Sequence, residues 1–146
     1  MTSPRALTAE TIAVGSELLL GNRIDTNSLF FADQLARAGI PLRYKTIVGD
    51  ERDDIVQAVR IAAGRVGIVI LTGGLGPTDE DCTRPAVARV TGRPLRRRAE
   101  ATRIMMARLA AWGRTPAPAH HKQAMIPAGA EVLDNPIGSA PGFALR

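Results

Sequence analysis

The strongest constraint on the fold is an apolar run, residues 67–72 (GIVILT), in which apolar and polar side chains do not alternate. A strand with one solvated face alternates, whereas a strand covered on both faces is continuously apolar and rich in β-branched residues. The run therefore predicts the central strand of a buried parallel sheet. Parallel strands are joined by long crossovers, usually helices, so helices are expected around it.

Two more strands are predicted before this run, at residues 11–14 and 41–48. Each is followed by residues that can begin a helix, so the order is strand, helix, strand, helix, strand. This order predicts an α/β fold, a three-layer, doubly wound and mostly parallel sheet with right-handed crossovers.

The two crossover helices are predicted from capping residues and from apolar periodicity. Asp25, Thr26 or Asn27 can cap the first helix, and Asp50 can cap the second. Apolar residues fall on one face of each helix at the expected spacing. These predicted core positions are Phe31, Leu35 and Ala38 in the first helix and Ile55, Val59 and Ala62 in the second.

The second half of the chain predicts two more helices, from about Thr83 to Gly92 and from about Ala99 to Trp112. Met105 and Trp112 are interpreted as core residues of the latter. Extended segments are expected at 131–133 and 143–145. At 146 residues, the chain has room for one domain. Because it stops on a bare strand, we expect it to be the front part of a longer protein.

Composition excludes several classes of protein. A single cysteine, Cys82, allows no internal disulfide and no multi-cysteine metal site, and it is interpreted as a small buried residue in a cytoplasmic protein. No signal peptide is expected in the first eight residues, and no apolar run approaches the roughly 20 residues of a membrane span. The formal charge of +5 includes Arg93, Arg96, Arg97 and Arg98, and this arginine run is interpreted as a solvated loop and helix start. Aromatics are only 3%, which argues against base stacking and a nucleic-acid partner.

Ligands of open parallel sheets bind beyond the carboxyl ends of the strands. The loop after the third predicted strand, Gly-Gly-Leu-Gly-Pro-Thr-Asp-Glu-Asp, is the leading candidate. Gly73, Gly74 and Gly76 let backbone N–H groups turn toward an anion, and Thr78 could add a hydroxyl donor. Glycines after a strand can equally make only a turn, and the loop matches neither the Walker nor the Rossmann pattern.

Acidic residues near this edge suggest a divalent cation between the protein and a phosphate. Glu17, Asp50 and Asp81 are the candidate ligands, since a magnesium-type ion is typically held by one or two carboxylates plus phosphate oxygens. Helix capping is the alternative for Asp50 and Asp79. Lys122 could offset phosphate charge, while His120 and His121 are more typical of a solvated loop. Further candidate ligand contacts are Ser16, Asn27 and Ser139.

Three segments together carry a family resemblance: residues 13–21 (AVGSELLLG), 71–81 (LTGGLGPTDED) and 135–143 (NPIGSAPGF). With Val48-Gly49-Asp50 and Lys122-Gln123-Ala124, they resemble the amino-terminal domain of the CinA family of competence/damage-inducible proteins, over nearly the whole chain. The resemblance departs at His120-His121, where an Asn-Arg pair is expected, and at Arg146, which precedes a Leu-Pro-Gly loop of the family.

The resemblance implies the fold of molybdopterin-binding domains, with Asp81 and Asp50 facing the ligand. It also implies metal-dependent ADP-ribose pyrophosphatase activity, in which Asp81, Asp50 and Lys122 are the candidate catalytic residues. One alternative is a non-catalytic module for a pterin-like or nucleotide ligand. Another is an oligomerisation or regulatory module for a nicotinamide-nucleotide amidohydrolase domain outside this chain. A homo-oligomer is expected.

Overall fold

The computed structural model describes residues 7–21 and 23–146, and it divides the chain into two compact units, residues 1–73 and 74–146. The prediction that no signal peptide is present concerns residues 1–8, and residues 1–6 lie outside the described ranges. No helix among the described residues has both the length and the apolar character needed to cross a membrane.

The first unit contains a parallel sheet of three described strands in the order β2-β1-β3. These strands are β1 (Ala9–Val14), β2 (Leu42–Val48) and β3 (Ile68–Thr72). Every residue of β1 is buried, whereas β3 is only partly buried. The predicted parallel sheet is confirmed, but the central strand is β1 and not β3. An apolar run indicates that both faces are covered, and it carries no information about neighbours within the sheet.

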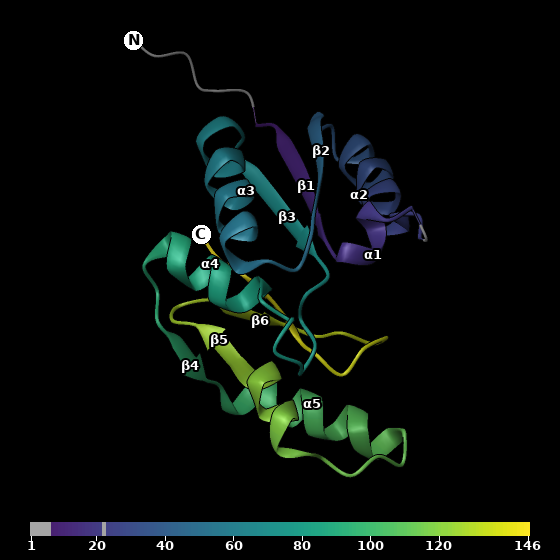
Figure 1. Cartoon of the computed structure of the whole chain (residues 1–146), viewed down its shortest axis with the longest axis vertical. Helices are drawn as coiled ribbons and strands as arrows, with labels where there is room; N and C mark the ends of the chain where they lie inside the picture. Colours follow the sequence, from purple (N-terminus) through teal and green to yellow (C-terminus); the bar gives the residue numbers. More distant parts are fainter. Residues whose placement is uncertain (1–6, 22) are drawn as a thin grey trace. The chain divides into compact units, whose positions relative to one another are not determined.

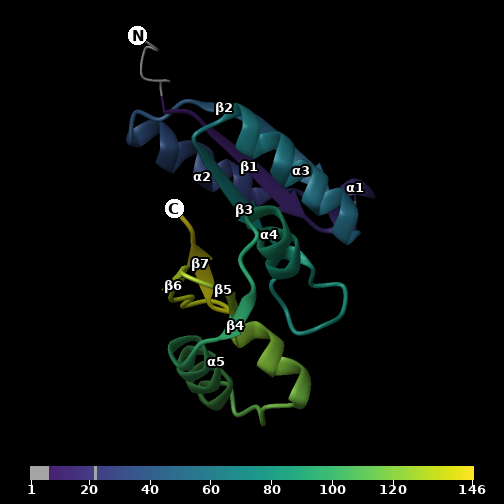
Figure 2. The same ribbon diagram turned by 90° about the vertical axis from the view of Figure 1, so that its left-hand side faces the viewer.

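Helices lie on both faces of this sheet, as the doubly wound fold requires. α2 (Thr26–Arg37) connects β1 to β2, and α3 (Arg52–Arg65) leads from β2 past β1 to β3. These two crossovers run in opposite directions along the sheet, so right-handed connections place the helices on opposite faces. Figures 1 and 2 show this arrangement, with the short α1 (Ser16–Leu19) at the end of β1.

The predicted helix starts and faces are confirmed in part. Asp25 caps α2, with its carboxylate accepting from the Ser28 backbone N–H at 3.0 Å. The capping residue of α3 is Glu51, so the interpretation of Asp50 as a helix cap is wrong. All three predicted core positions of α3 are buried. In α2 the predicted face holds one buried residue, Leu35, because Phe31 is partly exposed and Ala38 lies at the exposed end of the helix.

The carboxyl ends of the three strands lie at one edge of the sheet. Val14 is in register with Val48, and Ala13 with Thr72. The loops that begin at Gly15, Gly49 and Gly73 therefore leave the same edge, as predicted. In a sheet of order 2-1-3, the topological switch point lies between the first and third strands, and ligands of such sheets bind there. Gly73 thus follows a strand at the switch point.

An ion pair between the buried Glu10 and the exposed Arg65 in the first unit was not predicted. Glu10 in β1 is 1% exposed, and its carboxylate accepts from Arg65 Nε (2.8 Å), Arg65 Nη2 (2.7 Å) and Thr46 Oγ1 (2.7 Å). The Arg65 guanidinium also lies 3.6 Å from the centroid of the Tyr44 ring. Burial alone would raise the pKa of Glu10, but the hydrogen bonds from Arg65 and Thr46 and the charge of Arg65 hold it below the ordinary 4.5. This cluster fastens the end of α3 to the sheet.

The lowered pKa of Glu10 predicts a pH-dependent stability. A carboxylate whose pKa is lower in the folded chain stabilises the fold above its unfolded pKa of 4.5, and this contribution is lost as the pH falls through the folded pKa. We expect the difference in urea midpoint between the parent and Glu10→Gln to shrink between about pH 7 and about pH 3. A constant difference for Glu10→Gln would contradict the expectation.

The second unit is built from short elements. Its helices are α4 (Thr83–Thr91), α5 (Ala99–Ala111) and the 3₁₀ helix η1 (Pro118–Ala124). Two antiparallel ribbons accompany them: β4 (Leu95–Arg97) with β5 (Met125–Pro127), and β6 (Glu131–Leu133) with β7 (Gly142–Ala144). The predicted ends of α4 are confirmed, including the left-handed Gly92 that terminates it.

The core of the second unit gathers small and branched side chains from five elements and the loops between them. Buried members of one cluster are Ala101, Ala124, Ile126, Ala130 and Val132, with Phe143 and Leu145 packed against them. Met105 in α5 is fully buried, as predicted.

Two predictions for the second unit need correction. Trp112, interpreted as core, is 44% exposed because α5 ends at Ala111 and the chain turns away there. The arginine run is not simply a solvated loop and helix start. Arg96 and Arg97 lie in β4, while Arg93 and Arg98 donate to the backbone carbonyls of Ala128 and Ala130.

Candidate functional site

The glycine loop of the second unit, residues 74–81, is closed by the carboxylate of Asp81. Asp81 Oδ1 accepts from the Gly76 N–H at 2.7 Å, and Oδ2 accepts from the Thr78 N–H at 2.8 Å and from Thr78 Oγ1 at 2.7 Å. A Cβ at Gly76 would lie 2.4 Å from Asp81 Oδ2, so the carboxylate needs glycine there. The structure thus brings three predicted site residues together. The N–H groups of Gly76 and Thr78 and the Thr78 hydroxyl all donate to the Asp81 carboxylate in this structure.

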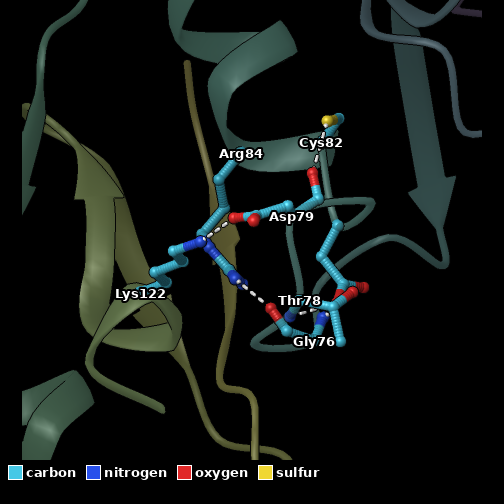
Figure 3. A network of polar contacts seen from close by, with 7 residues as sticks. Gly76, Thr78, Asp79, Cys82, Arg84 and Lys122 are labelled. Carbon is cyan, nitrogen blue, oxygen red and sulfur yellow. Dashed lines mark hydrogen bonds and ion pairs between the residues drawn. The ribbon is translucent and has the colours of Figure 1, made fainter. Parts of the chain in front are cut away.

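Arg84 holds the other side of the same loop and was not predicted. Its guanidinium donates to the carbonyl oxygens of Leu75 (2.8 Å) and Gly76 (2.9 Å), and the residue is 2% exposed. Burial lowers the pKa of Arg84 to about 10, while the charge of Asp81 opposes that shift. The guanidinium therefore stays charged at neutral pH. A carboxylate and a guanidinium near the start of α4 thus both hold the loop, and Figure 3 shows the Arg84 side chain directed at the Gly76 carbonyl oxygen.

Lys122 reaches the loop from η1, 43 residues further along the chain. Its ammonium forms an ion pair with the Asp79 carboxylate, and Figure 3 shows the two side chains pointing toward one another. The hydrogen bond and the charge of Lys122 hold the pKa of Asp79 below its usual range. Cys82 is buried, as predicted, and its thiol donates to the Asp79 carbonyl at 3.3 Å. A flexible cation is therefore held beside the loop.

The two adjacent histidines differ in their surroundings. His120 Nδ1 accepts from the Ala117 N–H at 2.9 Å, which caps the start of η1. His121 is exposed, and its Nδ1 lies 3.4 Å from Arg97 Nη2. His120 therefore has a structural role in η1.

Ser139 belongs to a turn that Asn135 organises. Asn135 Oδ1 accepts from the N–H groups of Ile137 (3.1 Å) and Gly138 (3.0 Å), and its Nδ2 donates to the Ala140 carbonyl at 2.9 Å. Ser139 Oγ accepts from Gln123 Nε2 at 3.0 Å. Gln123 lies next to Lys122, so η1 contacts this turn as well as the glycine loop.

In the first unit, two other predicted site residues form a reciprocal pair. The Ser16 N–H donates to Asp50 Oδ2 (2.9 Å), and the Asp50 N–H donates to Ser16 Oγ (3.2 Å), which joins the loops after β1 and β2. Asp50 therefore fastens these loops. Glu17 and Asn27 are both exposed, in the first turns of α1 and α2.

Among residues 7–21 and 23–146, no group of three or more histidine, cysteine or acidic side chains is placed to hold a metal ion. In the second unit, Asp81 already accepts three hydrogen bonds and Asp79 is paired with Lys122. The run 79–81 thus does not fit a metal cage built by that loop. A joint role of Glu17, Asp50 and Asp81 stays a prediction, as do the metal itself, the homo-oligomer and the cytoplasmic location.

Two cavities in the first unit, of about 370 and 420 Å³, are not lined by any predicted site residue. Both border Arg65, whose guanidinium is already paired with Glu10. Apart from their size, these two cavities show no feature that favours ligand binding. The candidate site is therefore formed by the loops and not by these cavities.

Comparison with known proteins identifies relatives over nearly the whole chain. Residues 10–146 match the profile of a family described as "Probable molybdopterin binding domain". A CinA-like protein of Synechococcus elongatus is 48% identical over 143 residues, which is 98% of this chain and 34% of that protein. A CinA-like protein of Anaeromyxobacter sp. is 44% identical over 96% of this chain and 34% of its own length. The chain thus spans about a third of these relatives.

Solved structures give the same result for the fold. The structure of the protein CinA from Thermoplasma acidophilum, described as of unknown function, superposes with a TM-score of 0.85 at 33% identity, over 96% of this chain and 82% of that one. MoaB from Pyrococcus furiosus, described as a tungsten cofactor synthesizing protein, has a TM-score of 0.57 at 16% identity over 97% of this chain and 81% of its own. The latter likeness shows a shared fold.

Proposed function

Since this chain belongs to the molybdopterin-binding domain family and is a CinA-like member of it, we propose that it binds a phosphorylated ligand, a nucleotide diphosphate or a pterin, at the loop from Gly73 to Asp81. The observation that carries the proposal is the convergence of Lys122 on this loop. An ammonium that is 53% exposed and paired with an exposed carboxylate can exchange that partner for a phosphate at little cost.

Two further observations support an anionic ligand. The loop is held in one conformation by Asp81 and Arg84, and a preorganised loop loses little entropy when it binds. The charge distribution agrees with this, because residues 74–146 contain eleven Lys and Arg against six Asp and Glu and so carry the whole formal charge of +5. A positive unit raises the local concentration of phosphorylated molecules.

Hydrolysis of the ligand's pyrophosphate bond is the finer proposal. Water would attack one phosphorus of ADP-ribose, and the bridging P–O bond would break to give AMP and ribose 5-phosphate. This step would need a divalent cation that enters with the phosphate oxygens, and a carboxylate of the glycine loop would have to release its present partner to meet that cation. The alternative is binding without turnover.

Calorimetry tests the proposed ligand binding, and analysis of the products tests the proposed hydrolysis. We expect ADP-ribose or ADP to bind, and we expect magnesium to permit AMP release if the domain is a hydrolase. Binding that is unchanged by a chelator, with no AMP formed, would leave the non-catalytic module. Absence of binding to ADP-ribose, ADP and a pterin phosphate, together with stable self-association in light scattering, would favour the oligomerisation module instead.

Replacing Lys122 by methionine should separate ligand binding from stability. The ion pair with Asp79 is exposed, so we expect the melting temperature to change by less than about 2 °C. Ligand affinity should fall about 5- to 20-fold, because a cation beside a phosphate is lost. Arg103→Met, which also removes one exposed positive charge from the second unit, serves as the control. An equal loss of affinity in both variants would indicate a general charge effect rather than a contact.

A further inference from the structure

The 3₁₀ helix η1 connects two loops of the second unit through consecutive residues. Lys122 is paired with Asp79 of the glycine loop, and Gln123 donates to Ser139 of the turn organised by Asn135. Adjacent α-carbons lie only about 3.8 Å apart. One short helix therefore holds both the glycine loop and the turn that carries Ser139.

The direction of the hydrogen bond between Gln123 and Ser139 determines what the hydroxyl can do. Gln123 Nε2 donates and Ser139 Oγ accepts, at 3.0 Å. The Ser139 proton is then not used in this contact and can be donated to another acceptor. Phosphate oxygens only accept hydrogen bonds, so a hydroxyl oriented in this way is suited to them.

A glutamine at position 123 lowers the stability of the fold relative to an apolar side chain of the same size. It is 1% exposed, and its Oε1 has no hydrogen-bond partner among the described residues. Buried polar atoms nearly always have a partner, and an apolar side chain of similar volume avoids the penalty of leaving one unmet. Arg108, which holds the Asn135 carbonyl through Nη2, likewise has an unpartnered buried Nε. Both side chains nevertheless contact the turn organised by Asn135, through Gln123 Nε2 and Arg108 Nη2.

We infer that Gln123 is a positioning residue: it directs the Ser139 hydroxyl toward an oxygen of the ligand's phosphate. The inference rests on the proposed function, since it assumes that a phosphorylated ligand binds at the adjacent glycine loop. Gln123 itself touches Ser139 and acts through it. Lys122 supplies charge to the same phosphate, and Ser139 supplies a directed hydrogen bond.

A double-mutant cycle with ADP as the probe tests this role. Affinities are measured by calorimetry for the parent, Gln123→Met, Ser139→Ala and the double variant. We expect each single substitution to weaken binding about 3- to 10-fold and the double variant to bind no more weakly than Ser139→Ala, because Gln123 acts only through Ser139. Gln57→Met, the same exchange at an exposed position in α3, should keep the parent affinity.

Stability provides the readout that separates positioning from packing. We expect the melting temperature of Gln123→Met to equal or exceed that of the parent, because the unmet Oε1 is removed. If this variant does not fold, Gln123→Glu replaces it; its carboxylate can only accept, so it captures the Ser139 proton and lowers affinity. Gln123→Glu is also combined with Ser139→Ala. The loss of affinity that Gln123→Glu still causes in this double variant measures repulsion between the new carboxylate and the phosphate.

The outcomes distinguish the role of Gln123 from the proposed binding of a phosphorylated ligand. Additive effects in the cycle, or parent-like affinity in Gln123→Met, would overturn the role of Gln123 while leaving phosphate binding in place. A parent protein that binds neither ADP nor ADP-ribose would overturn the proposed function and this inference with it. Non-additive loss of affinity with unchanged or higher stability is the result that supports it.

Discussion

Replacing Asp81 by alanine is expected to weaken binding of a phosphorylated ligand about 10- to 100-fold and to lower the free energy of unfolding by about 1–3 kcal/mol. The physical reason is that one carboxylate accepts three hydrogen bonds within the loop, two of them from the backbone. Without it, the Gly76 and Thr78 N–H groups lose their acceptor. The loop is then no longer held in one conformation, so binding must supply the ordering.

Asp81→Asn provides a stricter version of this experiment. The asparagine amide keeps one acceptor oxygen but turns an NH₂ group toward donors, so we expect it to lose most of what alanine loses. Calorimetry with ADP and urea unfolding measure the two effects. Glu80→Ala, in the exposed middle of the acidic run, should behave like the parent. If Asp81→Ala binds and turns over ligand normally, Asp81 has neither a catalytic nor a loop-organising role.

Gly73→Ala should produce the largest loss of stability, about 3 kcal/mol or more. Gly73 has a φ of +86°, where residues with a Cβ are strained, and an added Cβ would lie 2.1 Å from the Val14 carbonyl oxygen. That oxygen is backbone at the end of the central strand, so relief requires β1 and β3 to separate. Urea unfolding, followed by far-UV circular dichroism, measures the change.

Gly64→Ala is the matched control for this substitution. Gly64 lies in the last turn of α3 at a helical φ, and a Cβ there would meet nothing within 4 Å. Alanine is the better helix former, so the free energy of unfolding should stay the same or rise by up to about 1 kcal/mol. Equal destabilisation by both substitutions would indicate that the close approach of Gly73 to β1 does not matter to the fold.

Local signals in the sequence predicted most of the elements correctly. Asp25 as a helix cap, Gly92 as a helix end and the apolar face of α3 all follow from interactions within a few residues of each other. The edge where the loops after β1, β2 and β3 meet was also predictable, because parallel strands point the same way. The sequence also indicated Gly76, Thr78 and Asp81 as one local group, but it predicted them as phosphate and metal ligands, and the hydrogen bonds that Asp81 accepts within the loop were not predicted.

Some features were missed because the deciding contact lies far away in the sequence. Asp50 looked like a helix cap, and it is instead paired with Ser16, 34 residues earlier. Glu10 lies just before the predicted strand 11–14 and carried no prediction, and its partner Arg65 lies 55 positions away. Trp112 follows the apolar spacing of α5, but the helix ends before it. Periodicity identifies a face of a helix and not what covers that face.

The amino-acid sequence alone determined the α/β class, the family resemblance, the positions of the three parallel strands and the place of the glycine loop after the third of them, because each depends on local preference and pattern. Tertiary structure alone decided that β1 is the central strand, that Arg84 is buried beneath the loop and that Lys122 and Gln123 reach two different loops. Those features depend on which distant segments pack together. The free energy of packing is a property of the folded chain, and no short stretch of sequence contains it.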